Sequence, residues 1–388
     1  MVSNNSSIQI LLTAWALMMV SHWSSAQTIR TDGAKIRISP TATIVTPGSI
    51  SIQGNGGVLN SGTVYLKGDW TNSGQGLLDS LPGTVDFNGN VSQMVGGNNI
   101  TTFAFLRLSN PSGMLLSNNL NVGQTLIFND GRINTGPYEV RMIQAPANAI
   151  VGANASRYIN GNLRVAFDST AFSQYKYEIG STVYAPVQIR MLNVTDPGTL
   201  LAYTNAGPSS LENSPSPGAS GIDPFARVDR HWSLSQSGMA FQEFEADFDY
   251  ALTPSTGNVQ DYIIRHRDPA LGWLSEATSN NGTTASGVLS DGIFVIGELA
   301  NTAIAEGSTA LINLYPNPSR GKIYVNGLEQ GNCLLSVSDM TGRTVFETFQ
   351  HSNGTVELNF EALKLSAGTY VLKAQSTNYI SNIHFVIQ

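Results

Sequence analysis

The densest group of chemically active side chains in this sequence lies in one acidic stretch. Residues 241–250 read Phe-Gln-Glu-Phe-Glu-Ala-Asp-Phe-Asp-Tyr, with acidic and apolar residues in alternation. Because alternate side chains of a β-strand point to opposite faces, this pattern predicts four carboxylates on one face at intervals of about 6.6 Å. The four residues are Glu243, Glu245, Asp247 and Asp249.

Carboxylates in such a row suit three different roles. With loop carbonyls they are ligands for Ca²⁺, and two of them can serve as the general acid and base of a glycosidase. The third role is a solvent-exposed face, partly neutralised by Arg265 and Arg267 if these lie on the next strand of a hairpin. We favour the exposed face, and therefore predict no catalytic residue, no metal site and no cofactor. The four carboxylates stay as the alternative Ca²⁺ candidates.

Other residues that commonly support catalysis are sparse. His231 and His266 are the only histidines of the central sequence, and neither has metal-ligand spacing such as His-x-x-x-His. The chain has no His-Glu-x-x-His, Gly-x-Ser-x-Gly or Gly-x-x-x-x-Gly-Lys motif. Trp70, Trp232 and Trp273 would stack on sugar rings if exposed, but aromatic residues on strands more often pack in a core. The sequence thus indicates no catalytic constellation.

A repeat organises the sequence from residue 27 to 145. The segment Gly62-Thr-Val-Tyr-Leu-Lys-Gly68 returns as Gly83-Thr-Val-Asp-Phe-Asn-Gly89, 21 residues later. Short strands and polar turns at this period predict a β-solenoid, in which each coil buries its inward side chains against its neighbours. A β-meander or sandwich is the alternative, because strand periodicity alone does not choose a topology. The side chains expected inside the coils are those of Val64, Leu66, Val85 and Phe87.

Longer strands rich in aromatic and β-branched residues follow from 146 to 300 and predict a β-sandwich domain. Residues 205–224 are rich in Pro, Ser, Gly and Asn, and we expect them to form a long surface loop. Residues 301–310 are the predicted linker to a C-terminal domain at 311–388. Residues 27–300 are called the body below.

Three motifs follow one another in the C-terminal domain. The two prolines of the first motif exclude a helix and hold the residues before them in extended conformations. Runs with period-two alternation and glycine-containing turns predict about seven short strands, as in an immunoglobulin-like sandwich. The motifs are Leu-Tyr-Pro-Asn-Pro-Ser-Arg-Gly-Lys-Ile at 314–323, Val-Ser-Asp-Met-Thr-Gly-Arg at 337–343 and Leu-Ser-Ala-Gly-Thr-Tyr-Val-Leu at 365–372.

This succession of motifs resembles the type A C-terminal sorting domain of Bacteroidota proteins that are exported by the type IX secretion system (T9SS). The resemblance implies that the domain is recognised by the translocon and by an outer-membrane shuttle protein. It also implies removal by a surface sortase, which either links the cargo to lipopolysaccharide or releases it. The residues that match the motifs are Tyr315, Pro316, Asn317, Pro318, Gly321, Asp339, Gly342, Arg343, Gly368 and Tyr370.

The N-terminus has the pattern of a secretory signal peptide at residues 1–26. An apolar run at 8–20 is followed by small residues, which predicts cleavage between Ala26 and Gln27. A membrane-spanning helix needs about 20 apolar residues, so this run is too short and no transmembrane span is expected.

The composition agrees with an exported β-rich protein. Only 12% of the residues are charged and 41% are hydrophobic, which favours a folded chain over disorder. The single cysteine, Cys333, cannot form an internal disulfide, and the net charge of −7 disfavours nucleic acid as a partner. We therefore expect a secreted or cell-surface protein with an adhesive or structural body that binds a glycan or matrix protein. The alternative is a carbohydrate-active enzyme or glycan-binding accessory protein.

Overall fold

The protein is all-β, as predicted, and forms two compact units. One unit comprises residues 1–222 and 226–299, and the other, the C-terminal unit, comprises residues 223–225 and 300–388. The signal peptide predicted at 1–26 and the linker predicted at 301–310 lie outside the described residues. The computed structural model describes residues 27–74, 82–144, 148–212, 220–278, 282–300, 312–360, 365–376 and 380–388.

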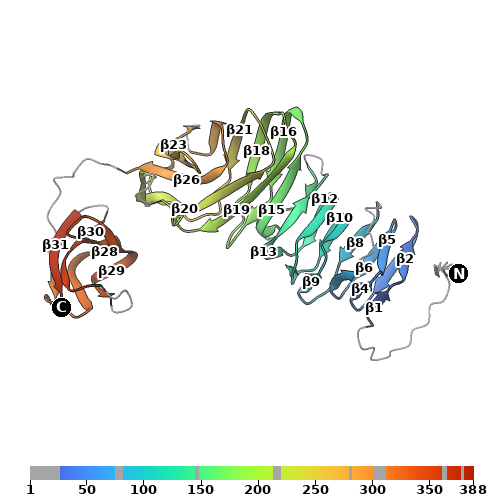
Figure 1. Ribbon diagram of the computed structural model, residues 1–388, viewed down its shortest axis with the longest axis horizontal. Coiled ribbons are helices and arrows are strands. Elements are labelled where there is room, and N and C mark those ends of the chain that lie inside the picture. Colours follow the sequence, from blue (N-terminus) through green and yellow to red (C-terminus); the bar gives the residue numbers. More distant parts are fainter. Residues whose placement is uncertain are drawn as a thin grey trace. The chain divides into compact units, whose positions relative to one another are not determined.

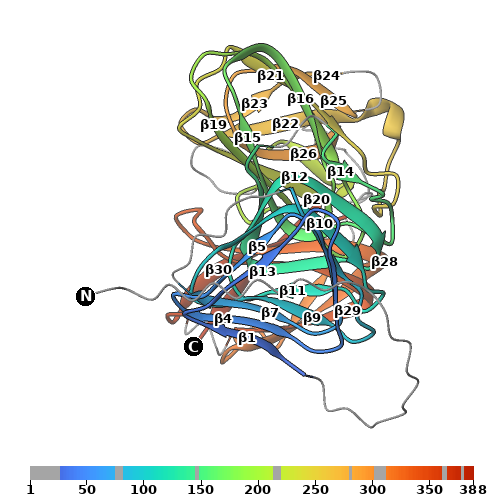
Figure 2. The same ribbon diagram turned by 90° about the vertical axis from the view of Figure 1, so that its right-hand side faces the viewer.

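The first part of the body is a β-solenoid, whose successive coils stack side by side through three parallel ladders (Figures 1 and 2). The first ladder consists of β1 (Ile29–Asp32), β4 (Ile50–Gly54), β7 (Trp70–Gly74), β9 (Gln93–Gly96), β11 (Met114–Leu116) and the start of β13 (Ile133–Met142). The second consists of β3 (Thr43–Thr46), β6 (Thr63–Leu66), β8 (Thr84–Phe87), the end of β10 (Thr101–Ser109), the end of β12 (Leu120–Asp130) and β14 (Ile150–Val151).

The third ladder lies between the other two along each coil. In the first coils it consists of β2 (Lys35–Ile38) and β5 (Gly57–Asn60), which pair in parallel. In the later coils it consists of the start of β10, the start of β12, the end of β13 and β15 (Ile159–Phe167).

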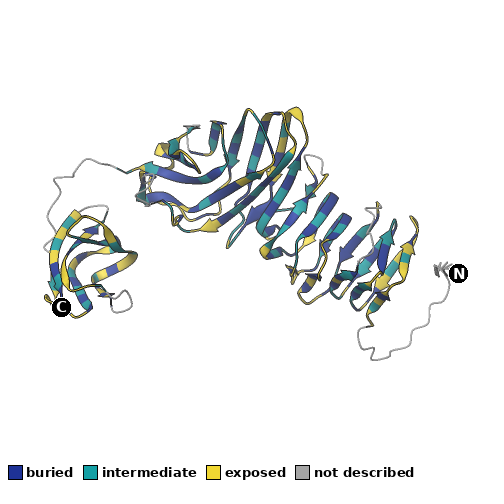
Figure 3. Cartoon of the chain, in the orientation of Figure 1, coloured by how far each residue is buried: buried dark blue, intermediate teal, exposed yellow. Residues whose placement is uncertain are grey.

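The side chains predicted to stack inside the coils do so. Val64 pairs with Val85, and Leu66 pairs with Phe87, across neighbouring coils. All four side chains are buried, and buried residues alternate with more exposed ones along β4, β6 and β7 (Figure 3). The Phe87 ring contacts the Phe103 ring edge to face at 5.8 Å between centroids. The repeat therefore builds a continuous apolar interior.

Glycine opens each copy of the repeat because adjacent coils touch at that corner. A Cβ atom at Gly62 would lie 2.2 Å from the carbonyl oxygen of Ala42, and one at Gly83 would lie 2.4 Å from that of Asn60. Asn60 also links the coils, because its side-chain amide donates to the carbonyl oxygen of Thr84 at 3.0 Å. Any other residue at these corners would force the coils apart.

Replacement of Gly83 by alanine is expected to destabilise the body. The added methyl group overlaps backbone that cannot move without separating two coils, and such overpacking costs about 1–3 kcal/mol. Gly123→Ala is the matched control, because its Cβ would meet its nearest atoms at 3.8 Å. Chemical denaturation of the mature chain should show a lower midpoint for Gly83→Ala alone, and equal midpoints for both variants would contradict the close contact.

The second part of the body is a sandwich of two sheets. In one sheet, β15 is followed by β19 (Gly198–Ala206), β20 (Ile222–Ser237), β26 (Gly292–Leu299), β22 (Ile263–Asp268) and β23 (Gly272–Ser275), and β17 (Ile179–Gly180) also pairs with β15. The other sheet has the order β16 (Thr170–Tyr177), β18 (Val187–Val194), β21 (Glu243–Phe248), β25 (Thr284–Val288) and β24 (Ala277–Thr278). One short 3-10 helix, η1 (Val259–Asp261), precedes β22.

Strand β15 joins the solenoid to the sandwich. It pairs in parallel with β13 on one side and antiparallel with β19 on the other, so that one sheet continues from the coils into the sandwich. A single cluster of buried apolar residues extends from Ile38 in the solenoid to Ile296 in β26. The domain boundary predicted at residues 145 and 146 lies outside the described residues, and the parallel ladders continue beyond it into β14 and β15.

The C-terminal unit consists of β27 (Asn313–Tyr315), β28 (Lys322–Asp339), β29 (Thr344–Asn359), β30 (Gly368–Gln375) and β31 (Ile380–Ile387). The pairing of β28 with β29 is interrupted between Asn326 and Gln330, which divides each of these strands into two segments. All five strands belong to one sheet, in which β27, β28, β30 and β31 follow one another and β29 also pairs with β28. The C-terminal unit is thus β-rich, as predicted, and Cys333 is buried in its core.

Candidate functional site

The first motif is bound to the last strand of the C-terminal unit. The Asn317 side chain accepts a hydrogen bond from the backbone N–H of Val386 at 2.9 Å and donates one to the carbonyl oxygen of His384 at 3.2 Å. The amide group of Asn317 therefore supplies hydrogen-bond partners to one N–H group and one carbonyl group of β31, as a neighbouring strand would. Tyr315, at the end of β27, stacks on Tyr324 at 5.2 Å and remains half exposed.

Ser319 fixes the same loop and was not selected from the sequence. Its backbone N–H donates to the carbonyl oxygen of Val386, and its own carbonyl accepts from the N–H of Gln388, each at 2.8 Å. Its buried hydroxyl donates to the carbonyl oxygen of Lys322 at 2.6 Å and accepts from the N–H of Gly321 at 3.2 Å. Ser319 belongs to the first motif at 314–323, but the motif does not show which groups its hydroxyl and backbone bind.

The second motif is a tight turn between β28 and β29, organised by the carboxylate of Asp339. One oxygen accepts from the backbone N–H groups of Thr341 at 3.0 Å and Arg343 at 3.1 Å, and the other accepts from Nε of Arg343 at 3.0 Å. Gly342 lies between them with φ of +85°, a conformation that favours glycine. Hydrogen bonds from Thr341 and then from Arg343 favour the ionised carboxylate and lower the pKa of Asp339 to about 2.

The stability of the C-terminal unit should therefore fall on acidification below about pH 4. Because the folded pKa of Asp339 lies below the ordinary value of 3.8, its contribution is present above that value and is lost as the pH falls towards 2. Asp339→Asn should remove this contribution at neutral pH. Calorimetry of the mature chain should show a lower C-terminal melting temperature for the variant at pH 7 and a smaller difference at pH 2. A difference independent of pH would exclude ionisation of Asp339 as the cause.

The third motif begins β30 and contains a tyrosine corner. Gly368 starts the strand, and the buried Tyr370 donates its hydroxyl to the carbonyl oxygen of Ser366 at 2.8 Å. Such a bond from a tyrosine to backbone a few residues upstream is characteristic of immunoglobulin-like sandwiches. The Tyr370 ring also contacts Phe385 of β31 at 5.9 Å between centroids.

The three motifs meet at one end of the C-terminal unit. Asp339 of the second motif is the register partner of Tyr370 of the third, and Tyr370 is in turn the partner of Phe385. Asn317 of the first motif binds the two residues that flank Phe385. Segments that lie far apart in the sequence thus occupy neighbouring positions across β28, β30 and β31. Arg343 and residues 315–318 are exposed at these turns.

Residues 243–248 of the acidic stretch form β21, with the apolar residues buried and Glu243, Glu245 and Asp247 partly exposed, whereas Asp249 follows the strand. The predicted arginine partners are wrong. Arg265 and Arg267 lie on β22, which belongs to the other sheet. Strand β21 instead pairs with β18, where Arg190 forms ion pairs with both Glu245 and Asp247. These two pairs occupy the centre of the carboxylate row.

Hydroxyl groups from β25 complete the bonding of these two carboxylates. Thr284 donates to Asp247 at 2.5 Å, and Ser286 donates to Glu245 at 3.2 Å. Asp249 accepts from the backbone N–H of Ala251 at 3.1 Å. Over the described ranges, no group of three or more His, Cys, Asp or Glu side chains is placed to hold a metal ion. The prediction that this row is an exposed face without a metal site stays a prediction, with Ca²⁺ as its alternative.

The histidines and tryptophans of the body are mostly buried. His266 stacks on Phe294 at 4.4 Å, and its ring nitrogens lie 2.7 Å from a carboxylate oxygen of Glu276 and 3.0 Å from the carbonyl oxygen of Asp291. Trp70 and Trp232 are part of the core, whereas Trp273 is partly exposed. Packing thus accounts for two of the three tryptophans.

Comparison with known proteins identifies the C-terminal part of the chain. Residues 313–388 match the family model of the secretion system C-terminal sorting domain. No curated protein and no solved structure is similar to the chain. The described part of the chain contains no helix of the length and apolarity that crossing a membrane requires. Residues 313–388 are a T9SS sorting domain, which implies secretion or a cell-surface location.

Proposed function

We propose that the body is an adhesive protein that its sorting domain delivers to the outside of a Bacteroidota cell. In this proposal the sorting domain binds the translocon and the outer-membrane shuttle, and a sortase then removes it. The body is either attached to the surface or released, and it binds a glycan or a matrix protein. A structural role at the surface is the related possibility within the same class.

One observation carries the adhesive assignment: the body presents an uninterrupted sheet whose outward side chains form polar rows. The strands β10, β12, β13 and β15 are in register, so that outward residues of successive coils are neighbours. Stacked repeats of this kind provide the extended binding surfaces that solenoid proteins use. One such row consists of Thr102, Asn121, Arg141 and Arg164.

The acidic strand gives little support to the alternative of a carbohydrate-active enzyme. A glycosidase needs one carboxyl group that is free to donate a proton and a second that attacks or activates water. Glu245 and Asp247 instead share Arg190.

The proposed export route begins with cleavage of the signal peptide. We expect the secreted protein to start at Gln27, cyclised to pyroglutamate, because small residues precede this position. Mass spectrometry of the N-terminal peptide from the exterior fraction should find this form. Retention of Met1 or of the apolar run in the secreted protein would contradict cleavage.

The adhesive function is tested with the purified mature chain on an array of glycans and matrix proteins. Saturable binding to at least one of these surfaces, without hydrolysis, is the expected result. Glycan cleavage would favour the enzymatic alternative. Absence of binding to every surface would overturn the proposal.

A further inference from the structure

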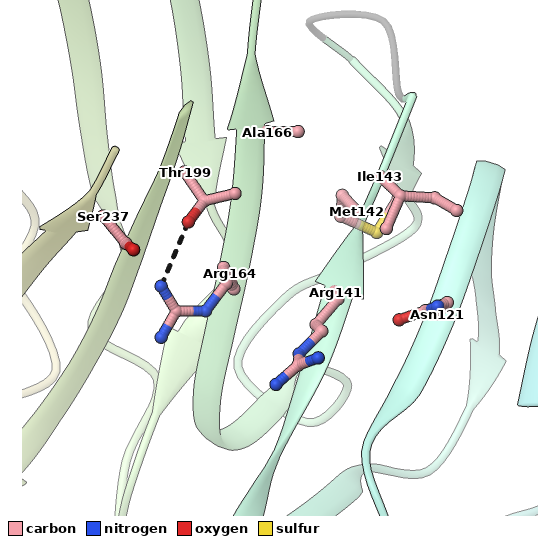
Figure 4. A pocket seen from close by; sticks show the side chains of 8 residues that line it. All are labelled: Asn121, Arg141, Met142, Ile143, Arg164, Ala166, Thr199 and Ser237. Atoms are coloured by element: carbon pink, nitrogen blue, oxygen red, sulfur yellow. Dashed lines mark hydrogen bonds between the residues drawn. The ribbon is translucent and has the colours of Figure 1, made fainter. Parts of the chain in front are cut away.

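A pocket of about 460 Å³ lies on the outer face of the sheet where the solenoid continues into the sandwich (Figure 4). Its side chains come from β12, β13, β15, β19 and β20, so that it spans both parts of the body. The volume is within the range of pockets that bind small molecules. It is lined by Asn121, Arg141, Met142, Ile143, Arg164, Ala166, Thr199 and Ser237, none of which is acidic.

Two arginines of the pocket are held in place by one glutamate beside it. Glu139 accepts from Nε of Arg141 at 2.8 Å, and from Nε and Nη2 of Arg164 at 2.9 Å each. Arg164 also donates to the hydroxyl of Thr199 at 3.1 Å. These bonds, led by those from Arg164, lower the pKa of Glu139, so the group keeps two positive charges and one negative charge at neutral pH. The local net charge is therefore positive, in contrast to the whole chain.

The bonds to Glu139 leave donors of Arg141 directed to solvent. Its side chain is 32% exposed, and only its Nε takes part in a hydrogen bond within the described part of the chain. A guanidinium group with unused terminal N–H groups matches a carboxylate in two parallel hydrogen bonds. Because the net charge of −7 repels anions at a distance, such a ligand would be held by contact rather than by long-range attraction.

The rest of the pocket offers groups that suit hydroxyls. The side-chain oxygen of Asn121 is buried at the pocket and has no hydrogen-bond partner among the described residues. A small rotation would let it accept from a ligand hydroxyl and so relieve an unsatisfied polar group. The hydroxyl groups of Thr199 and Ser237 lie on neighbouring strands in register with each other.

We propose that this pocket binds an acidic saccharide, with Arg141 receiving the carboxylate and Asn121, Thr199 and Ser237 receiving ring hydroxyls. The inference rests on the proposed adhesive function, for which it names the class of ligand. The proposed saccharide site lies at the junction of the solenoid and the sandwich. There, side chains from the solenoid coils and from β19 and β20 line the same pocket.

The test is calorimetric titration of the mature chain with tetrasaccharides of galacturonate, glucuronate and mannuronate. At least one should bind, and its neutral methyl ester should bind more weakly. Arg141→Gln should weaken binding of the acid by about tenfold or more, the usual effect of losing a charge-assisted hydrogen bond. Arg37→Gln is the control, because Arg37 is exposed on β2 of the same ladder and away from the pocket.

Other outcomes separate this inference from the proposed function. Equal affinity of wild type and Arg141→Gln, equal weakening by Arg37→Gln, or binding of none of the acids would overturn the pocket assignment and leave adhesion standing. Equal binding of a tetraglutamate peptide would overturn the saccharide assignment. Asn121→Ala, which removes no charge, should weaken the acid and the methyl ester alike. Melting curves of the three variants establish that each is folded.

Discussion

Phe87→Asp is expected to unfold the body at physiological temperature. Phe87 is fully buried between Leu66 and Leu108 of the adjacent coils, with which it is in register. The substitution removes an aromatic side chain from the core, at about 3–5 kcal/mol, and adds the further cost of a buried carboxylate without a partner. This loss is comparable to the whole stability of many domains, which is about 5–15 kcal/mol.

Circular dichroism and denaturant titration of the mature chain measure this effect. Val45→Asp is the matched control, because Val45 is 67% exposed on β3 of the same solenoid. A change at an exposed site of this kind is expected to stay within about 0.5 kcal/mol. Similar tolerance of aspartate at both positions would show that the inward and outward faces of the coils are wrongly assigned.

Deletion of residues 313–388 is expected to abolish delivery of the body to the cell exterior. The deleted segment contains all three motifs and the strands that hold them together, while the body keeps its own apolar core. The truncated protein should therefore accumulate, folded, in the periplasm. Fractionation of a T9SS-competent host, with Gly123→Ala in the full chain as the control, measures this. Truncated protein at the surface in wild-type amounts would contradict the assignment.

The solenoid was predictable because its physical cause is local. Coils touch at Gly62 and Gly83, and these contacts impose the same residue types at the same spacing. The role of β15 was not predictable, because nothing in a period-two pattern shows that one edge pairs in parallel and the other antiparallel. The sequence pattern therefore predicts a separate sandwich domain, whereas in the structure one sheet of the sandwich continues the sheet of the solenoid.

The ion-pair partners of the acidic stretch were also not predictable from the local sequence. Arg265 and Arg267 are the closest basic residues downstream of the acidic stretch, but β21 and β22 lie in different sheets. Arg190 is opposite Glu245 across strands that are far apart in sequence. Pairing between distant strands depends on the packing of the whole sandwich, which local alternation does not encode.

The motif residues of the C-terminal unit were identified by resemblance, and the structure adds the reason for their types. Asp339 accepts a backbone hydrogen bond within the turn between β28 and β29, and Gly342 adopts the positive φ of that turn. The side chain of Asn317 binds the backbone of β31. Ser319 was missed because its contacts are mainly with backbone. The pocket was missed because Arg141 and Arg164 become neighbours only through the pairing of β13 with β15.

We expect the C-terminal unit to direct export across the outer membrane without any part of the body. A fusion of residues 301–388 behind a signal peptide and a passive fluorescent reporter, expressed in a T9SS-competent host, measures this. Protease added to intact cells should then remove surface-attached reporter, or the reporter should be found in the medium, and neither should occur in a host without the translocon. A reporter that stays in the periplasm of the competent host would contradict the claim.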